Sequence, residues 1–345
     1  MAKIELTKSD TAGIKGIAIL FMLWHHQFLN THGYGALTLS LAVVFKVCVA
    51  LFLFVSGYGL TRQYDNLDRR GFRAMAVLLL RRFISFFLQY WFCFVLVVLI
   101  GNLCGYSFQD AYPAMRNTLK CFILDFFGQM GYSSYLHPWW FNKLIIQLYL
   151  LFPFLYLLQS NKYSAWIGLA LIIPLQLYAK SIPGAVFCLV EGGIPAFYLG
   201  MISARHMSAP SISSKVWRIV LFSVAIISIV GLAVLHNHVL PASPYLAVLI
   251  RALLAVCVVL IYKEFGGDHI SLFSFLGKYS AVMYLTHVLL IILIPKVLYY
   301  SKFSLVAFII FVVASLLMSI VIDWLQKILH YDKLRHELVN MASKL

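Results

Sequence analysis

The stretch Lys15-Gly-Ile-Ala-Ile-Leu-Phe-Met-Leu-Trp-His25-His26 decides how this chain is interpreted, because it places two histidines inside the first long apolar segment. Ionisable side chains are costly inside a bilayer, so those that occur there usually serve a function. Lys15 and His26 are eleven residues apart, and eleven helical steps make three turns plus roughly 20°. Both side chains are therefore expected on one helix face, about 16 Å apart along the axis. This spacing suits a long anionic ligand with its reactive end at His26.

The composition indicates a polytopic membrane protein. Of the 345 residues, 62% are hydrophobic and only 11% are charged, whereas a soluble protein carries about 25% charged residues. The net charge of +15 would suggest a nucleic-acid partner for a soluble chain, but here the positive-inside rule explains it and no nucleic acid is expected. The six cysteines lie mostly in apolar stretches and form no CxxC pair, so we interpret them as small hydrophobic residues and expect no metal site.

Ten apolar stretches approach the length of about 20 residues that a spanning helix needs. The sequence therefore predicts an all-α integral membrane protein of about ten transmembrane helices, with residues 1–345 forming a single domain. The approximate cores are 16–33, 37–60, 83–101, 139–158, 164–179, 185–203, 216–235, 245–262, 279–298 and 304–325.

The distribution of lysine and arginine predicts that both termini lie in the cytoplasm. With that orientation, 19 basic residues fall in cytoplasmic segments and five fall outside, as the positive-inside rule requires. Three more, Lys46, Lys143 and Arg251, fall within spans. The five outer residues are Arg116, Lys120, Lys180, Lys296 and Lys302, and Lys344 is among the cytoplasmic ones.

Two connections are longer than simple loops. Residues 61–82 are expected to form a basic cytoplasmic segment, and residues 102–138 a longer outer segment. The apolar piece around Asp125 in the outer segment is too short to span, so we expect an interfacial or re-entrant helix there.

His26 is the leading candidate for a general base, because histidine takes up a proton near neutral pH. It could deprotonate a hydroxyl that attacks an acyl thioester. His25 points about 100° away, so it either orients the site or faces a neighbouring helix. His287 lies nine residues beyond Lys278, about 13 Å along a second helix. The two histidines, His26 and His287, could share a cavity, or His287 could make a structural bond between helices.

Basic and small residues near the expected cytoplasmic side are candidates for binding a nucleotide-bearing donor. Arginine forks bind phosphate bidentately, and Arg62, Arg81 and Arg82 stand at the ends of two spans. The alternative is that these arginines only fix topology and touch lipid headgroups. The small residues of Ser56-Gly57-Tyr58 permit close helix approach. They would also let a narrow acyl arm pass, which makes Ser56 and Tyr58 further candidates.

Candidates for binding the second substrate lie near the expected outer face. Trp139 and Trp140 either anchor at the headgroup level or stack on a sugar ring, with Asn142 close by in sequence. Acidic residues are few there, namely Asp110, Asp125 and Glu191. One of them could bind a hydroxyl or pair with a histidine, and Glu191 is included among the site candidates.

Four segments resemble, in order, the blocks of membrane acyltransferase family 3, the ten-helix O-acyltransferases of bacterial polysaccharides. The first, with Lys15 and His26, is similar to the family's arginine, ten residues, then histidine. Lys15 keeps the charge of that arginine without its planar fork. The blocks are Gly13-Ile-Lys15…His26, Phe52-Leu-Phe-Val-Ser56-Gly57-Tyr58-Gly-Leu-Thr-Arg62, Trp140-Phe141…Gln147-Leu-Tyr149-Leu-Leu-Phe-Pro153 and Leu276-Gly277-Lys278-Tyr-Ser280…Tyr284-Leu285-Thr-His287.

The resemblance implies that His26 is the catalytic histidine and that Lys15 binds the donor. It further implies cytoplasmic acetyl-CoA as donor, a glycan or lipid-linked glycan as acceptor, and a location in the bacterial inner membrane among its lipids. The rival interpretation is a proton-coupled transporter or flippase with His26 and His287 as a proton relay. No internal repeat of the kind that many transporters show is evident.

Overall fold

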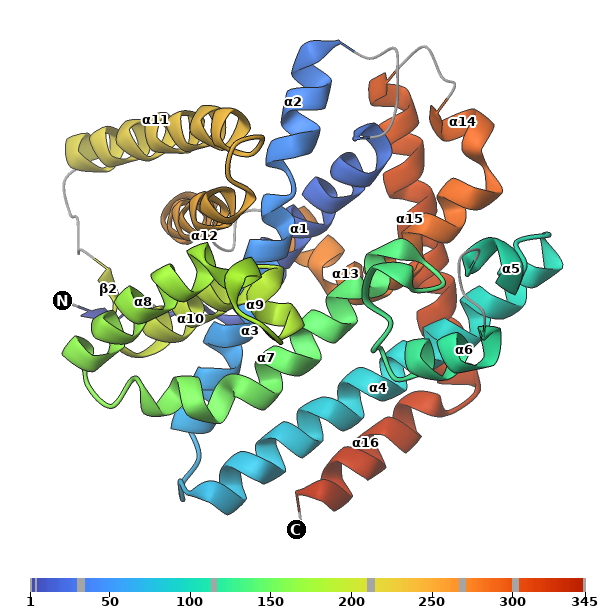
Figure 1. Ribbon diagram of the computed structural model, residues 1–345, viewed down its shortest axis with the longest axis horizontal. Coiled ribbons are helices and arrows are strands. Elements are labelled where there is room, and N and C mark those ends of the chain that lie inside the picture. The colour runs from blue at the N-terminus through green and yellow to red at the C-terminus, as the bar shows by residue number, and fades with distance from the viewer. Residues whose placement is uncertain are drawn as a thin grey trace. The chain divides into compact units, whose positions relative to one another are not determined.

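The computed structural model describes residues 2–3, 5–29, 35–112, 117–209, 215–266, 271–299 and 304–343. Arg116, Lys302 and Lys344, which enter the charge count above, lie outside these ranges. Apart from an antiparallel pair of two-residue strands, β1 (Ala2–Lys3) and β2 (Ser208–Ala209), the regular structure in the described ranges is helical (Figure 1). This confirms the all-α expectation.

The helices follow the apolar stretches of the sequence. The α-helices are α1 (Lys8–Phe28), α2 (Ala36–Val44), α3 (Val47–Asp65), α4 (Phe72–Leu103), α5 (Phe108–Ala111), α6 (Thr118–Phe126), α7 (Trp140–Leu157), α8 (Lys162–Leu177), α9 (Phe187–Val190), α10 (Gly193–Arg205), α11 (Lys215–Val239), α12 (Pro244–Ile261), α13 (Ser271–Leu293), α14 (Pro295–Tyr299), α15 (Ser304–Ile328) and α16 (Tyr331–Ala342). Short 3₁₀ or π turns are η1 (Gly131–Ser133), η2 (His137–Trp139), η3 (Ala179–Ser181) and η4 (Tyr262–Gly266).

Seven helical stretches in the described chain are long and apolar enough to cross a membrane. The remaining three of the ten expected spans correspond to α1, to α8 and to the pair α9–α10, which are helical but shorter or more polar. A multi-pass membrane protein is thus supported, while the number ten and the side of each terminus stay predictions. The seven stretches are Ala36–Asp65, Phe72–Leu103, His137–Leu157, Phe222–Val239, Pro244–Glu264, Ser271–Leu293 and Ser304–Ile328.

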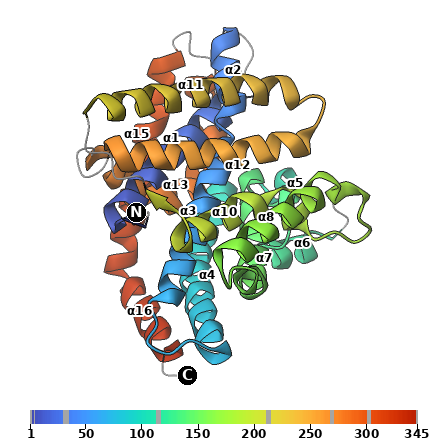
Figure 2. The same ribbon diagram turned by 90° about the vertical axis from the view of Figure 1, so that its left-hand side faces the viewer.

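The chain divides into two compact units. The first comprises Met1–Leu29, Gly35–Asn66 and Leu151–Lys278. Within it, α3 packs against α1, α10 and α12, and α11 runs along α12, as Figures 1 and 2 both show.

The crossing of α3 and α10 depends on glycine. A Cβ on Gly57 would lie 2.1 Å from the carbonyl oxygen of Phe197, and a Cβ on Gly200 would lie 2.1 Å from that of Phe54. The two backbones are therefore in direct contact, which is the close approach that glycine permits in membrane helices. The expectation that Gly57 serves close helix approach is confirmed.

Two expected spans of the first unit are interrupted. The stretch expected at 37–60 is divided between α2 and α3 by the turn at Phe45 and Lys46. The stretch expected at 185–203 is divided between α9 and α10 at Glu191 and Gly192. Gly192 has a φ of +81°, a left-handed conformation that glycine adopts without steric cost.

The second unit comprises Asn30–Tyr34, Leu67–Leu150 and Tyr279–Leu345. Its α16 lies beside α4 (Figure 1), where Tyr331 Oη donates to the Leu88 carbonyl at 2.8 Å and Arg335 donates to Gln89 Oε1 at 2.8 Å. An aromatic core including Tyr90, Phe94 and Trp139 fills this unit.

The two long connections are more helical than the sequence suggests. Because α3 ends at Asp65 and α4 begins at Phe72, the basic connection expected at 61–82 shortens to residues 66–71. Its arginines at 62, 73, 81 and 82 stand on helices. In the outer segment, α6 has nine residues, too few to span, as expected.

Candidate functional site

Lys15 and His26 both lie on α1, which is one continuous helix of 21 residues. The predicted register therefore holds, and both side chains are partly buried. Ile19 and Met22 lie between them on the same face at helical spacing, and both are buried. The strip that joins the cation to the imidazole is thus apolar and enclosed by protein.

His25 joins α1 to α2. Its side chain is buried, and its Nδ1 lies 2.7 Å from the carbonyl oxygen of Ala42. Because a carbonyl only accepts, Nδ1 carries the proton. The His25 and His26 rings meet edge to face with centroids 5.1 Å apart. The sequence left open whether His25 orients the site or faces a neighbouring helix. In the structure, His25 contacts the neighbouring helix α2, and its ring also lies against the ring of His26.

The N-terminal parts of α1 and α13 cross at glycines. A Cβ on Gly16 would lie 2.0 Å from the carbonyl oxygen of Phe273, and a Cβ on Gly277 would lie 1.8 Å from that of Ala12. The first and last family-like blocks therefore touch through their backbones. Lys15 and Lys278 directly adjoin these glycines in sequence. Lys278 was not among the site residues predicted from the sequence. The signal that could have found it is a lysine next to a glycine, which Gly277-Lys278 shares with Lys15-Gly16.

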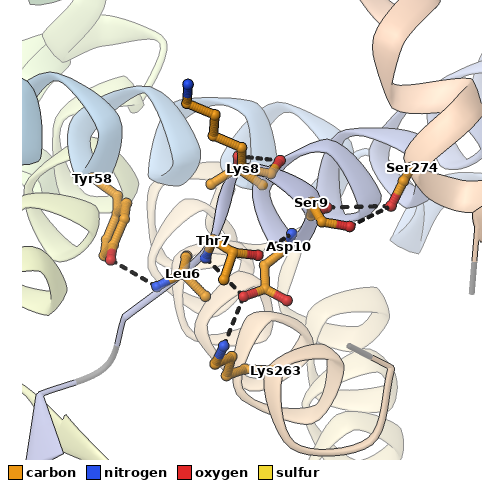
Figure 3. Close-up of polar contacts among 9 residues, drawn as sticks. Leu6, Thr7, Lys8, Ser9, Asp10, Tyr58, Lys263 and Ser274 are labelled. Atoms are coloured by element: carbon orange, nitrogen blue, oxygen red, sulfur yellow. Dashed lines mark hydrogen bonds and ion pairs between the residues drawn. The ribbon is translucent and has the colours of Figure 1, made fainter. Parts of the chain in front are cut away.

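The start of α1 is fixed by a network of polar contacts (Figure 3). Thr7 and Asp10 form a reciprocal capping box, which satisfies two of the free amides at a helix start. Lys263 Nζ bonds Asp10 Oδ2 at 2.7 Å, and the Ser9 and Ser274 hydroxyls are 3.3 Å apart. Burial raises the pKa of the Asp10 carboxyl, but the bonds from Lys263 and Thr7 outweigh it and hold that pKa below its ordinary value.

Two of the donor-binding candidates on α3 hold the N-terminal segment. The buried Tyr58 accepts a bond from the Leu6 amide at 2.8 Å (Figure 3). Arg62 pairs with Glu5 at 3.1 Å. Ser56, a third candidate, is partly buried on the same helix. Tyr58 and Arg62 are therefore tied to the segment that leads into α1.

Arg81, Arg82 and His287 belong to the second unit. The two arginines are partly buried on α4. His287 is fully buried on α13, and its Nδ1 lies 2.9 Å from the Tyr284 carbonyl and 3.2 Å from that of Met283. With Nδ1 donating, Nε2 is the basic nitrogen of the neutral ring. A cavity shared by His287 and His26 stays a prediction.

Trp139, Trp140 and Asn142 are all buried in the second unit. Trp139 donates its indole proton to the Leu285 carbonyl at 3.0 Å and packs against Tyr90 with ring centroids 5.3 Å apart. The Tyr284 hydroxyl lies 3.4 Å from Asn142 Oδ1. Trp139 thus has the surroundings of a core residue, and sugar stacking by the tryptophans stays a prediction.

Asp125 organises the outer segment. It is fully buried and accepts bonds from the Tyr135 amide at 2.5 Å and the Tyr112 hydroxyl at 2.9 Å, with the Tyr90 hydroxyl at 3.4 Å. Burial raises the pKa of its carboxyl to about 6, against the opposing effect of these bonds. Asp110, which lies in the same segment, caps α5 through Ser107. Asp125 therefore acts as a structural acceptor.

Glu191 stands at the interruption between α9 and α10. It interacts electrostatically with Lys46, which lies at the interruption between α2 and α3, and Lys46 also interacts with Arg251. The sequence had left Lys46 and Arg251 inside spans without a role. No group of three or more histidine, cysteine or acidic residues in the described ranges could hold a metal ion.

The chain matches a protein-family model described as an acyltransferase domain. The family is membrane acyltransferase family 3, and the match covers residues 12–324. The match contains α1 from Ala12 and most of α15, so it covers both units. No curated protein and no solved structure matches the chain.

Proposed function

Because the chain belongs to membrane acyltransferase family 3, we propose that it is an O-acyltransferase that moves an acetyl group from cytoplasmic acetyl-CoA to a hydroxyl of an envelope or exported polysaccharide. The observation that carries this proposal is the unbroken α1 with Lys15 and His26 on one face. The protein would lie in the bacterial cytoplasmic membrane, among its lipids.

The donor would bind near the start of α1. Lys15 and Arg62 supply positive charge there, with Arg81, Arg82, Ser56 and Tyr58 as further candidates. A phosphate also benefits from the positive end of the helix dipole. The pantetheine arm would then run along the enclosed apolar strip of Ile19 and Met22. That strip has no side chain able to relay a proton, which favours an acyl donor over the transporter interpretation.

His26 would act as the general base. The acceptor hydroxyl attacks the thioester carbonyl, the carbon–sulfur bond breaks, and the hydroxyl proton passes through His26 to the CoA thiolate. His25 would position the His26 ring through their edge-to-face contact. His287 would supply a second basic nitrogen. The sequence candidates for contacting the acceptor are Trp139, Trp140, Asn142 and Glu191, of which Trp139 has the surroundings of a core residue.

The test uses acetyl-CoA labelled in the acetyl group, purified protein and the host's glycan. Wild type is expected to label the glycan and His26→Ala to lose about 10²-fold or more in rate, the scale of general-base catalysis. His336→Ala, which removes an exposed histidine of α16, serves as the control. Equal transfer by wild type and His26→Ala would remove His26 from the mechanism.

A second experiment examines Lys15. Lys15→Arg is expected to preserve activity, and Lys15→Ala to raise the KM for the donor about tenfold or more, because a charge-assisted contact is lost. An unchanged donor KM in Lys15→Ala contradicts the donor-binding role. Label retained on the protein without glycan would indicate an acetylated enzyme, whereas its absence would indicate direct transfer.

A further inference from the structure

Five ionisable residues gather where the helices of the first unit are interrupted. We call them the helix-break cluster; its members are His25 on α1, Lys46 between α2 and α3, Glu191 between α9 and α10, His236 on α11 and Arg251 on α12. Charged residues within spans are rare unless they serve a function. The donor route of the proposed function uses none of them, and Lys46, His236 and Arg251 have no role in it at all.

Two hydrogen bonds from side chains to backbone carbonyls connect both α1 and α11 to α2. His25 Nδ1 bonds the Ala42 carbonyl of α2 at 2.7 Å. Asn237, the residue after His236, donates to the Ser40 carbonyl of α2 at 3.3 Å. His25 and Asn237, the neighbour of His236, therefore lie against the last turns of α2, just before Lys46.

Contact between the α9–α10 interruption and α12 brings in Glu191 and Arg251. A Cβ on Gly192 would lie 2.4 Å from Val248 Cγ1. Arg251 follows Val248 by three residues, so the two side chains share one face of α12. Lys46 interacts electrostatically with both Glu191 and Arg251. His25 and His236 each interact with both cations.

The charge of the helix-break cluster favours an anion. Lys46 and Arg251 bring two positive charges and Glu191 one negative charge, so these three residues carry one net positive charge. A net positive charge attracts an anion. A ligand with a single negative charge, such as a carboxylate, would neutralise it, and the arginine fork suits that group.

His236 has a buried ring nitrogen that could accept a hydrogen bond from a ligand hydroxyl. Its side chain is fully buried, and Nδ1 lies 3.4 Å from Asn237 Oδ1. Because that amide oxygen accepts, Nδ1 donates, and Nε2 of the neutral ring is an acceptor. In the described part of the chain, the buried Nε2 has no hydrogen-bond partner. Such a group usually finds one, and a ligand hydroxyl would supply it.

We propose that the helix-break cluster binds an acidic sugar, with its carboxylate on Lys46 and Arg251 and one hydroxyl donating to His236 Nε2. A sugar held there lies beside His26, because the ring of His25 contacts the ring of His26. The acidic sugar would therefore be the acceptor, an assignment that rests on the proposed function.

The experiment measures binding without any donor. Protein in phosphatidylcholine nanodiscs is titrated at constant ionic strength with methyl glucuronide or with methyl glucoside, which has an uncharged hydroxymethyl group in place of the carboxylate. The readout is the shift in Tm. Wild type and Lys120→Gln, which removes an exposed outer lysine of α6, are expected to respond to the glucuronide alone. Lys46→Gln and Arg251→Gln should weaken that response about tenfold or more.

Lys46→Arg serves as a folding control, because it keeps the charge and should keep the response. An equal response to the glucoside, an undiminished response in Lys46→Gln, or no response of wild type would overturn the proposal. Loss of the glucuronide response in nanodiscs containing phosphatidylglycerol would also overturn it, because the occupant would then be a lipid phosphate. His26→Ala should still bind the glucuronide, because His26 is not a member of the helix-break cluster. If wild type binds the glucuronide but fails to label the glycan, only the transferase proposal is contradicted.

Discussion

The Glu5 carboxylate pairs with the Arg62 guanidinium at 3.1 Å, at the end of α3 where a donor phosphate is proposed to bind. The pair is partly exposed, with 68% of the Glu5 side chain accessible. Exposed ion pairs are worth about 0–1 kcal/mol, so a phosphate could displace Glu5 at modest cost.

We therefore predict that Glu5→Gln lowers the donor KM by up to about fivefold, the factor that corresponds to about 1 kcal/mol. Arg62→Gln should raise the KM, and the double variant should resemble Arg62→Gln. Steady-state kinetics with varied acetyl-CoA checks this. If adding Glu5→Gln to Arg62→Gln still shifts the donor KM, then Glu5 affects donor binding by a route other than its pair with Arg62.

The crossing of α3 and α10 gives a stability prediction. In Gly57→Ala the new Cβ would lie 2.1 Å from the Phe197 carbonyl oxygen, so the helices must separate, at a cost of about 1–3 kcal/mol. Gly231→Ala on α11 is the matched control, because no atom lies near the added methyl group and alanine favours the helix by up to about 1 kcal/mol. Thermal unfolding in detergent should show a lower Tm for the first variant only. Equal Tm changes in both would contradict the close crossing.

Local signals in the sequence predicted much of the first unit. The Lys15–His26 register needed only an unbroken helix. The start of α1 at Lys8, which the Thr7 and Asp10 capping box fixes, lies outside the expected core at 16–33. The interruptions at Lys46 and Glu191 could not be predicted. They lie inside apolar runs, which indicate burial whether or not the helix continues.

Tertiary contacts decide the parts of the site that the sequence left open. Trp139 donates a hydrogen bond to the carbonyl of Leu285, a residue 146 positions away. Asp125 accepts hydrogen bonds from tyrosines of three separate segments. No spacing rule predicts such partners. The same holds for Arg251, whose role depends on which helices lie beside α12.

The Asp10–Lys263 pair gives a third prediction. Asp10 is 3% exposed, so Lys263→Met would leave a buried carboxylate with its cap bonds alone, at a cost of about 1–3 kcal/mol. Since the folded pKa of Asp10 is lowered, the stability from this group is present above pH 3.8 and is lost as the pH falls through the folded pKa. The Tm difference between wild type and Lys263→Met should therefore shrink in acid. With Asp10→Asn as background, Lys263→Met should cost little at any pH.

Asp125 predicts the opposite pH dependence. Burial raises its pKa from 3.8 to about 6, so between these values the folded protein holds a proton that the unfolded chain has released. Stability from this group is thus present below pH 3.8 and falls as the pH rises towards 6; it decreases by about 3 kcal/mol over the window. Asp125→Asn cannot titrate, so the Tm of wild type relative to this variant should drop between acid and neutral pH and then level off. Asp110→Asn, at an exposed helix cap, should leave that drop unchanged. A wild-type Tm that tracks Asp125→Asn at every pH would show that Asp125 is ionised throughout the window and that its tyrosine and backbone donors compensate fully for burial.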